Sequence, residues 1–229
     1  MRVTLTQVIS TEPIKTIKHA EQYTSTLSRP SKMPGWSYSI PAESCKVGSK
    51  LWKIKGSVCN NCYARAGRYQ FPNVQTALAS REALMKEEPR WVEAMSFLIN
   101  KRHKDVPYFR WFDSGDLQSV EMLEQIIEVC NNTPDVQHWL PTREKAIVIK
   151  YIRKGIDLPD NLNIRLSAPM VDSSQGITKV EGCTVSTVST EDAVQPKAWH
   201  CPSRHQAGKC GDCRACWSKD VPQVDYHKH

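Results

Sequence analysis

The stretch VPYFRWFDSGDLQSVEMLEQIIEVC, residues 106–130, holds one complete strand–loop–helix unit. Its first part, residues 106–112, is an apolar and aromatic run of strand length, which predicts a buried strand. The polar turn DSGD follows, and apolar residues then recur at helical spacing over 119–130. A buried strand that leads through a short polar loop into an amphipathic helix is the repeating unit of a parallel α/β sheet.

The same unit recurs on both sides of this stretch. The other predicted elements are strands at 33–42, 136–140 and 163–168, and helices at 73–88, 90–102 and 144–154. Strands that alternate with helices indicate a parallel sheet with right-handed crossovers. The predicted fold class is therefore α/β, a partial, open β/α barrel with a small Cys-rich C-terminal appendage.

The pattern divides the chain into three parts. Residues 1–30 are a polar N-terminal segment with weak patterning, apart from a short strand expected at 2–9. Residues 31–180 carry the predicted partial barrel and the first group of thiols. From residue 181 the rhythm breaks, and residues 181–229 are expected to form the cluster-binding appendage.

Composition and charge narrow the class of protein. The chain has 229 residues, nine Cys and a formal net charge of +7. It has no apolar run long enough to span a membrane and no signal-peptide pattern, which predicts a cytoplasmic protein. In that compartment nine thiols, an odd number, favour metal ligands over disulfides. The basic residues are scattered, so an ordinary basic surface is favoured over a nucleic-acid partner.

The stretch CKVGSKLWKIKGSVCNNCY, residues 45–63, carries three thiols, at Cys45, Cys59 and Cys62. The last two form a C-x-x-C hook, which points two sulfurs at one centre, as zinc or an iron–sulfur cluster requires. Nothing nearby completes a set of four. Three Cys ligands on a four-iron cluster would leave one iron open to a further ligand, so this stretch is predicted to cradle a reactive cluster.

The thiols of the C-terminal part form the most specific motif in the chain. Cys210, Cys213 and Cys216 make a C-x-x-C-x-x-C run, with Cys201 upstream. Four-iron ferredoxins use such a run, whereas zinc typically takes two separated hooks, so a second iron–sulfur cluster is favoured over zinc. Cys183 is the alternative to Cys201 as the fourth ligand.

Polar loops follow the predicted strands, where binding residues of parallel sheets collect. We therefore expect DSGD and the later loop PTRE to converge on the first group of thiols. Asp113 and Asp116 flank a turn, where capping of the next helix and ligand contact are both open. By position, either of these aspartates could also supply the fourth ligand of the first cluster. Arg143 could hold a carboxylate or phosphate, or form a surface ion pair.

Other conspicuous side chains are predicted to serve packing or solvation. The residues expected in the interior are Cys130 and His138, with Trp36, Trp52 and Trp111 as core or cluster shielding rather than a stacking platform for bases. His200 and His205 flank a predicted Cys ligand, and either could replace it in a cluster. We expect both of these imidazoles to face solvent.

The hook Cys59–Cys62, followed by Tyr63 and placed after the first strand of a β/α series, resembles the radical S-adenosylmethionine superfamily. The usual spacing there is C-x3-C-x2-C, whereas this chain has C-x13-C-x2-C. The resemblance implies S-adenosylmethionine at an open iron and an oxidoreductase-type activity. It also implies that Ser114, Gly115 and Asp116 occupy the slot of a Gly-Gly-Glu-like motif that holds the amino group of this cofactor.

A second resemblance covers most of the chain. The segments PGWSYSIPAESC, GSVCNNCYA, WFDSGDL and CGDCRACW resemble a bacteriophage protein family designated by a gene-product number. This resemblance implies a viral origin and expression in the cytoplasm of a bacterial host. It brings no activity with it.

The expected function is an iron–sulfur protein with two [4Fe-4S] clusters, acting as a radical S-adenosylmethionine-like redox enzyme of phage origin. Two alternatives stay open. One is an electron carrier or sensor without S-adenosylmethionine activity, and the other is a zinc-binding module. The expected partner is an electron donor of the host or the phage, and no membrane is expected to be involved.

Overall fold

A computed structural model describes residues 12–104, 106–175, 177 and 179–228. Seven strands form one sheet in the order β1-β2-β3-β4-β5-β7-β6, and every neighbouring pair is parallel. The strands are β1 (Trp36–Tyr38), β2 (Tyr108–Trp111), β3 (Gln137–Thr142), β4 (Leu162–Ser167), β5 (Thr184–Ser189), β6 (Trp199–His200) and β7 (Gln223–His227). Among the described residues the sheet is open, with β1 and β6 at its edges. The predicted α/β class is confirmed.

Helices connect the first strands. The α-helices are α1 (Ile17–Thr24), α2 (Lys46–Leu51), α3 (Pro72–Glu87), α4 (Trp91–Arg102), α5 (Val120–Asn131) and α6 (Lys145–Ile152). Short 3-10 turns are η1 (Ala42–Ser44), η2 (Tyr63–Arg65), η3 (Gly67–Gln70), η4 (Asp192–Val194) and η5 (Pro202–His205). None of the helices in the described ranges is long and apolar enough to cross a membrane.

The strands and helices expected between residues 33 and 168 are all present, with bounds shifted by a few residues. The strand expected over 33–42 is reduced to β1. The helices α1 and α2 were not expected, and the strand expected at 2–9 lies outside the described residues. Helix α2 escaped prediction because it is a single short helix of six residues, with a glycine, inside the thiol loop.

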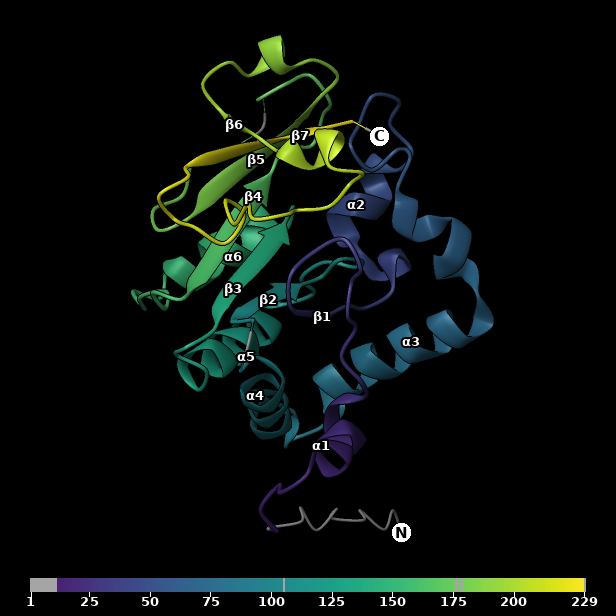
Figure 1. Ribbon diagram of the computed structural model, residues 1–229, viewed down its shortest axis with the longest axis vertical. Helices are drawn as coiled ribbons and strands as arrows, with labels where there is room; N and C mark the ends of the chain where they lie inside the picture. Colours follow the sequence, from purple (N-terminus) through teal and green to yellow (C-terminus); the bar gives the residue numbers. More distant parts are fainter. Residues whose placement is uncertain (1–11, 105, 176, 178, 229) are drawn as a thin grey trace, which may run out of the picture.

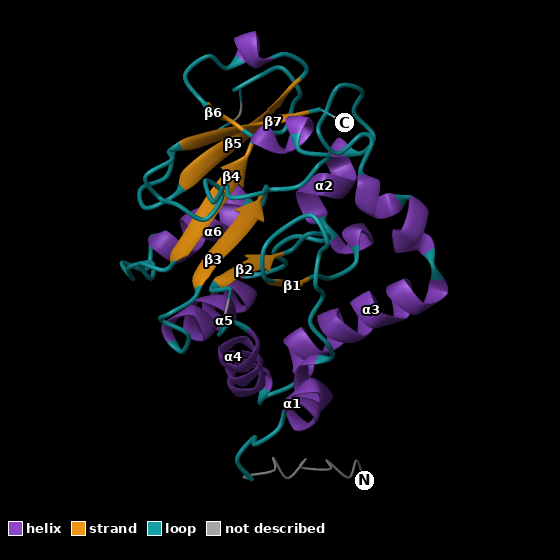
Figure 2. Ribbon diagram, viewed as in Figure 1, coloured by secondary structure: helices purple, strands orange, loops and turns teal. Residues whose placement is uncertain are grey.

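The helices α4, α5 and α6 lie along one side of the sheet, and this layer holds the main core (Figures 1 and 2). Side chains alternate along each strand, so Phe109 and Trp111 of β2 enter this core. Arg110, between them, belongs to the opposite face of the sheet. In β4 the same alternation sends Ile164 into the core and leaves Arg165 on the other face. The sheet therefore has an apolar face under the helices and a second face with buried polar groups.

The C-terminal part of the chain covers this second face. Asn163 donates a hydrogen bond to the carbonyl of Cys216 at 2.9 Å. Arg165 donates to the carbonyls of Ala215 at 3.0 Å and Val221 at 3.1 Å. A smaller apolar cluster forms here from Trp139, Ala215, Cys216, Trp217 and Val224. Strand side chains thus hold the Cys-rich segment by its backbone.

Residues 181–229, expected as an appendage, supply three of the seven strands of the sheet. Strand β5 pairs with β4, and β7 pairs with β5 on one side and β6 on the other. The segment is therefore continuous with the rest of the sheet. The sequence concealed this continuity because β5 is made of Thr, Ser and Val, and because β7 pairs out of sequence order.

Candidate functional site

The first group of thiols, Cys45, Cys59 and Cys62, lies in the loop after β1. Gly48 stands beside two of them, because a Cβ at this position would lie 3.6 Å from the Cys45 sulfur and 3.7 Å from the Cys59 sulfur. Burial raises the pKa of the Cys45 thiol, and the negative charges of Asp116, Cys59 and Cys62 raise it further. The structure thus brings the three predicted thiols together, beside Asp116.

Two guanidinium groups flank these thiols. Burial raises the pKa of the Cys59 thiol, and the positive charge of Arg143 opposes this rise. Arg65 acts in the same sense on Cys45 and Cys59, and it donates to the carbonyl of Ala42 at 3.0 Å. The Nε atom of Arg143 is buried and has no hydrogen-bond partner in the described part of the chain. Arg65 and Arg143 are therefore placed to offset the charge of thiolates in the first group, and Arg143 retains one unused N–H donor.

Asp116 ties the loop after β2 to the loop after β3. Its carboxylate accepts hydrogen bonds from the Thr142 hydroxyl at 2.5 Å and from the backbone N–H groups of Arg143 at 2.9 Å and Leu117 at 2.8 Å. Burial raises the pKa of Asp116 to about 6, against the effect of these hydrogen bonds. The expected convergence of DSGD and PTRE on the first thiols is therefore present in the structure.

Ser114 and Gly115 pack the DSGD loop against the end of β1. The Ser114 hydroxyl donates to the carbonyl of Ile40 at 2.9 Å. Gly115 has φ +79°, and a Cβ there would lie 2.7 Å from the Ile40 oxygen, so only glycine fits this approach. Phe112, just before the loop, also has a positive φ of 54°, which is strained for an aromatic residue. The chain therefore holds this loop in one specific conformation.

The two aspartates expected as alternative fourth ligands are both engaged within the protein. Asp116 accepts the three hydrogen bonds described above. The Asp113 carboxylate accepts one from the Tyr69 hydroxyl at 3.0 Å, and the Asp113 carbonyl accepts one from the Tyr63 hydroxyl. Both carboxylates therefore accept hydrogen bonds that hold the loop in place. Only a remaining lone pair of each could bind a ligand.

Glu144 is a supporting residue that the sequence did not reveal. It is 5% exposed, and its carboxylate accepts a hydrogen bond from the backbone N–H of Val47 at 2.7 Å. The ammonium of Lys46 in turn donates to the carbonyl of Gln118 at 2.6 Å. Helix α2 is thus fastened to the loops after β2 and β3. The position of Glu144 at the start of the predicted helix 144–154 was the available signal. Its side chain makes no capping hydrogen bond to α6 and accepts one from Val47 instead.

The second group of thiols gathers on the second face of the sheet, opposite α4, α5 and α6. It consists of Cys201, Cys210, Cys213 and Cys216. Burial raises the pKa of the Cys210 thiol, and the charges of Cys201 and Cys213 add to this rise. Burial raises the pKa of the Cys216 thiol to about 12, and its sulfur lies 3.1 Å from the Tyr226 hydroxyl. All four predicted thiols are close to one another.

Cys183, the alternative to Cys201, lies apart from this group. It packs against the main core, whereas Cys201 and Cys213 pack against the smaller apolar cluster of the C-terminal segment. Burial raises the pKa of the Cys183 thiol to about 12, and the positive charge of Lys219 opposes this rise. The structure therefore favours Cys201 as the fourth member of the second group.

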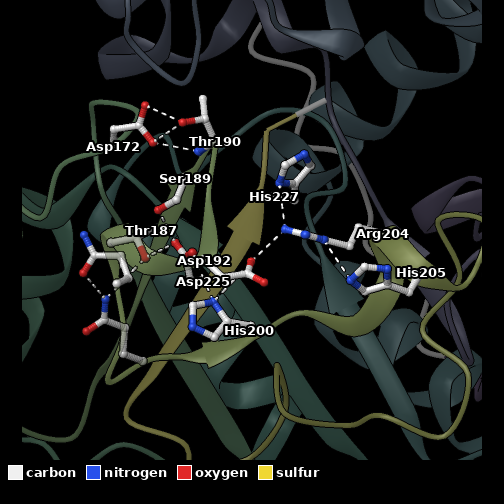
Figure 3. A network of polar contacts seen from close by, with 12 residues as sticks. Asp172, Thr187, Ser189, Thr190, Asp192, His200, Arg204, His205, Asp225 and His227 are labelled. Atoms are coloured by element: carbon white, nitrogen blue, oxygen red, sulfur yellow. Dashed lines mark hydrogen bonds and ion pairs between the residues drawn. The ribbon is translucent and has the colours of Figure 1, made fainter.

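A polar network surrounds the strand that leads into Cys201 (Figure 3). The Nδ1 atom of His200 lies 3.5 Å from a carboxylate oxygen of Asp225 and 3.7 Å from one of Asp192. Arg204 donates to Asp192 at 2.7 Å, and the backbone N–H of Cys201 donates to the Asp225 carbonyl at 2.9 Å. The network fastens β6 to β7 just before the first thiol of the second group.

His200 is half-buried, with 33% of its side chain exposed, so the expectation that it faces solvent holds only in part. Its Nδ1 atom is buried, whereas His205 is exposed as expected. Asp225 is the reason, since it lies on β7, a strand that the sequence did not indicate. His138, Cys130 and Trp111 are fully buried, as predicted.

Arg110 lies between the two groups of thiols. Its guanidinium interacts electrostatically with Tyr63 and Asp113 near the first group and with Tyr226 and Cys216 in the second. The Cζ atom of Arg110 lies 4.5 Å from the centre of the Trp139 ring. The Nε atom of Arg110 has no hydrogen-bond partner in the part of the chain that the structure describes. One cation thus interacts with residues beside the first group and with Cys216 of the second.

The donor set fits an iron–sulfur cluster in its chemistry. In the described ranges, no three His, Cys, Asp or Glu side chains converge as ligands of one metal ion. A four-iron cluster takes one thiolate at each iron corner, so its ligands are spread around the cluster instead of meeting at one point. Soft thiolates bind such clusters as well as zinc, and a buried thiolate is costly unless it is coordinated or paired.

Two hollows of the protein have no thiol among the described residues that line them. One of about 590 Å³ is bordered by α3 and α5, with Lys46 and Gln118 at its edge. Another of about 290 Å³ is lined by Tyr108 and Trp217.

Fold and site together define a cysteine-rich α/β protein with an open parallel sheet and two gathered groups of thiols. The chain belongs to the gene product 88 family, a family of the phage type, whose model matches residues 7–219. This match confirms the likeness to a phage family and carries no link to the radical S-adenosylmethionine superfamily. No curated protein and no solved structure matches the chain.

Proposed function

We propose that this protein is a phage iron–sulfur redox protein with two [4Fe-4S] clusters, and that the first cluster has an open iron that takes S-adenosylmethionine. One observation carries the proposal. Cys45, Cys59 and Cys62 gather with the cations Arg65 and Arg143 at the loops that follow β1, β2 and β3. Ligand sites of parallel sheets are built from such loops.

The residues that would hold each cluster follow from the two groups. Cys45, Cys59 and Cys62 would hold the first. Cys201, Cys210, Cys213 and Cys216 would hold the second. When bound, such clusters supply one-electron transfer, and an open iron can chelate an amine and a carboxylate.

Around the first cluster, the chain's own residues would position the ligand. Arg143, whose buried Nε has no partner among the described residues, would pair with the ligand's carboxylate. The lone pair that Asp116 retains would accept from its amino group. Ser114 and Gly115 would act indirectly, by fixing the loop that carries Asp116.

An electron carrier or sensor without S-adenosylmethionine activity is the second candidate. The position of the two hollows favours it, because neither is lined by a thiol. In both cases an electron donor of the host or the phage would be the partner, in the cytoplasm of a bacterial host. The colour of the purified protein distinguishes a zinc-binding module from both candidates, because iron–sulfur proteins are coloured and zinc proteins are not.

Iron and sulfide counting after anaerobic purification tests the proposal. Two four-iron clusters predict about eight irons per chain. Cys62→Ala and Cys213→Ala should each remove about four irons, because each breaks a different ligand set. Cys183→Ala, a thiol outside both groups, is the matched control and should keep the full count. A colourless, zinc-containing protein, or a full iron count in both ligand variants, would contradict the proposal.

A further inference from the structure

The loop that carries the first thiols is strongly basic. Residues 44–70 contain four Lys and two Arg but no Asp or Glu. Lys50, Lys53, Lys55 and Arg68 are exposed, and the described part of the chain offers their side chains no hydrogen bond or ion pair. The loop therefore presents free positive charge.

Large apolar side chains stand exposed among these charges. Trp52 is 45% exposed, Tyr63 59% and Phe71 55%. The expectation that Trp52 lies in the core was therefore wrong, and its role in shielding a cluster stays a prediction. Exposed rings that gather in one part of a chain, rather than being scattered singly, are typical of surfaces that bind a partner.

The parts of this surface are fixed relative to one another. Arg65 joins η2 to the region of α2, because it donates to the Ser49 hydroxyl at 2.5 Å and lies 4.9 Å from the centre of the Trp52 ring. Asn60 donates to the carbonyl of Trp52 at 3.0 Å. The rings of Tyr63 and Tyr69 lie edge to face, with centroids 5.8 Å apart. The aromatic side chains therefore stand on a braced loop.

We propose that this surface, formed by Lys50, Trp52, Lys53, Lys55, Tyr63 and Arg68, binds single-stranded nucleic acid. Basic side chains that follow a backbone and exposed rings that stack on unpaired bases are the two components of such sites. Protein interfaces favour Arg and aromatic residues but are depleted in Lys. The surface has three Lys for one Arg, so its composition fits phosphates better than an acidic protein.

Two carboxylates stand at the border of the surface. Asp113 accepts a hydrogen bond from Tyr69, and Asp172 accepts hydrogen bonds from the backbone and the hydroxyl of Thr190. Both keep their negative charge, and the four basic side chains of the surface outnumber them. The inference goes beyond the proposed redox function. It does not depend on S-adenosylmethionine, and the surface lies beside the first thiols.

Fluorescence anisotropy on the full chain, with a labelled oligothymidine of about 12 nucleotides, tests the inference. Trp52→Ala should weaken binding about tenfold through the loss of one stacked base. Trp52→Phe keeps a ring and should retain most of the affinity, even if Trp52→Ala folds poorly. Trp199→Ala is the matched control, because Trp199 is 51% exposed on β6, and it should leave binding unchanged.

Salt dependence supplies the test of the charges. Four phosphate contacts predict a slope of about −3 for log affinity against log salt on a single strand. Lys53→Gln together with Lys55→Gln should reduce the magnitude of this slope by about 1.4. Lys15→Gln with Lys18→Gln, at the start of α1 and far from α2 in Figure 1, should leave the slope unchanged.

Three results would overturn the inference. They are no binding of the oligonucleotide at low salt, equal effects of Trp52→Ala and Trp199→Ala, and equal affinity for a duplex of the same length. Tight binding of polyglutamate without binding of oligothymidine would also overturn it, in favour of an acidic protein partner. Iron counted on the same samples separates a failure here from a failure of the proposed function, because binding is measured without S-adenosylmethionine.

Discussion

The two groups of thiols differ in what holds them. The first stands on a loop of short helices, fastened by hydrogen bonds to other loops, such as that from Val47 to Glu144. The second lies on the face of the sheet, where Asn163 and Arg165 of β4 bind its backbone carbonyls. Aromatic rings enclose the second group, with Trp139 and Trp217 at a centroid distance of 5.2 Å.

This difference indicates two kinds of site. A group whose backbone is held by buried strand residues suits a structural or electron-relaying role. A group on a braced but exposed loop, with an unused guanidinium donor beside it, suits contact with a ligand. We therefore expect reactivity at the first group and support from the second.

The largest expected effect comes from Arg165→Leu. The guanidinium donates to the carbonyls of Val185, Ala215 and Val221 in the interior, so its removal leaves these acceptors unsatisfied. We expect the free energy of unfolding to fall by about 3–5 kcal/mol in urea denaturation. Arg153→Gln, at an exposed position after α6, should change it by less than about 0.5 kcal/mol.

Hydrogen exchange localises this effect. In Arg165→Leu, the amides of residues 201–217 should exchange faster, whereas those of residues 45–62 should keep their rates. Equal acceleration in both segments would show that the two groups are not supported separately.

Glu144→Ala should produce the opposite pattern with a smaller cost. The variant lacks the carboxylate that accepts a 2.7 Å hydrogen bond from the backbone N–H of Val47, so this N–H group loses its charged acceptor. We expect a loss of about 1.5–3 kcal/mol and faster exchange in residues 45–62 only. Glu144→Gln retains an acceptor oxygen and should recover most of the stability. Unchanged exchange at α2 in the alanine variant would contradict the assigned role of Glu144.

Acid should weaken the sheet on which the second group rests. Burial lowers the pKa of His138 to about 3, whereas an unfolded chain protonates this imidazole near pH 6.5. Below about pH 6.5 the unfolded state therefore binds the extra proton, and stability falls as pH falls. Between about pH 6.5 and pH 5 we expect a loss of about 2 kcal/mol from this group.

Denaturation at several pH values measures this loss. In His138→Gln, which can still bond with the Thr133 hydroxyl, the slope over that interval should be shallower. An equal slope in the two proteins would assign the acid sensitivity to other groups.

Much of the first half of the sheet was predictable because its elements are periodic. The strand in VPYFRWF and the helix after DSGD have the spacing of a buried strand and an amphipathic helix, and both are present as β2 and α5. The thiols could be grouped from their spacing alone. Asp116 and Arg143 could be placed near the first group because both follow parallel strands.

The rest depended on contacts that periodicity does not encode. Strand β7 contains the buried Asp225 and pairs between β5 and β6, so neither its pattern nor its order was apparent. Glu144 and Arg110 act through partners far away in the sequence. The exposure of Trp52 was unexpected because a tryptophan in a cysteine loop more often packs inward.

Electron paramagnetic resonance of the reduced protein, with and without S-adenosylmethionine, tests most directly whether the first group takes a further ligand and the second does not. We predict that S-adenosylmethionine changes the signal of wild type and of Cys213→Ala, which retains the first group. It should leave the signal of Cys62→Ala, which retains only the second group, unchanged. No change in wild type, with the first cluster shown to be intact by iron count, would contradict the account.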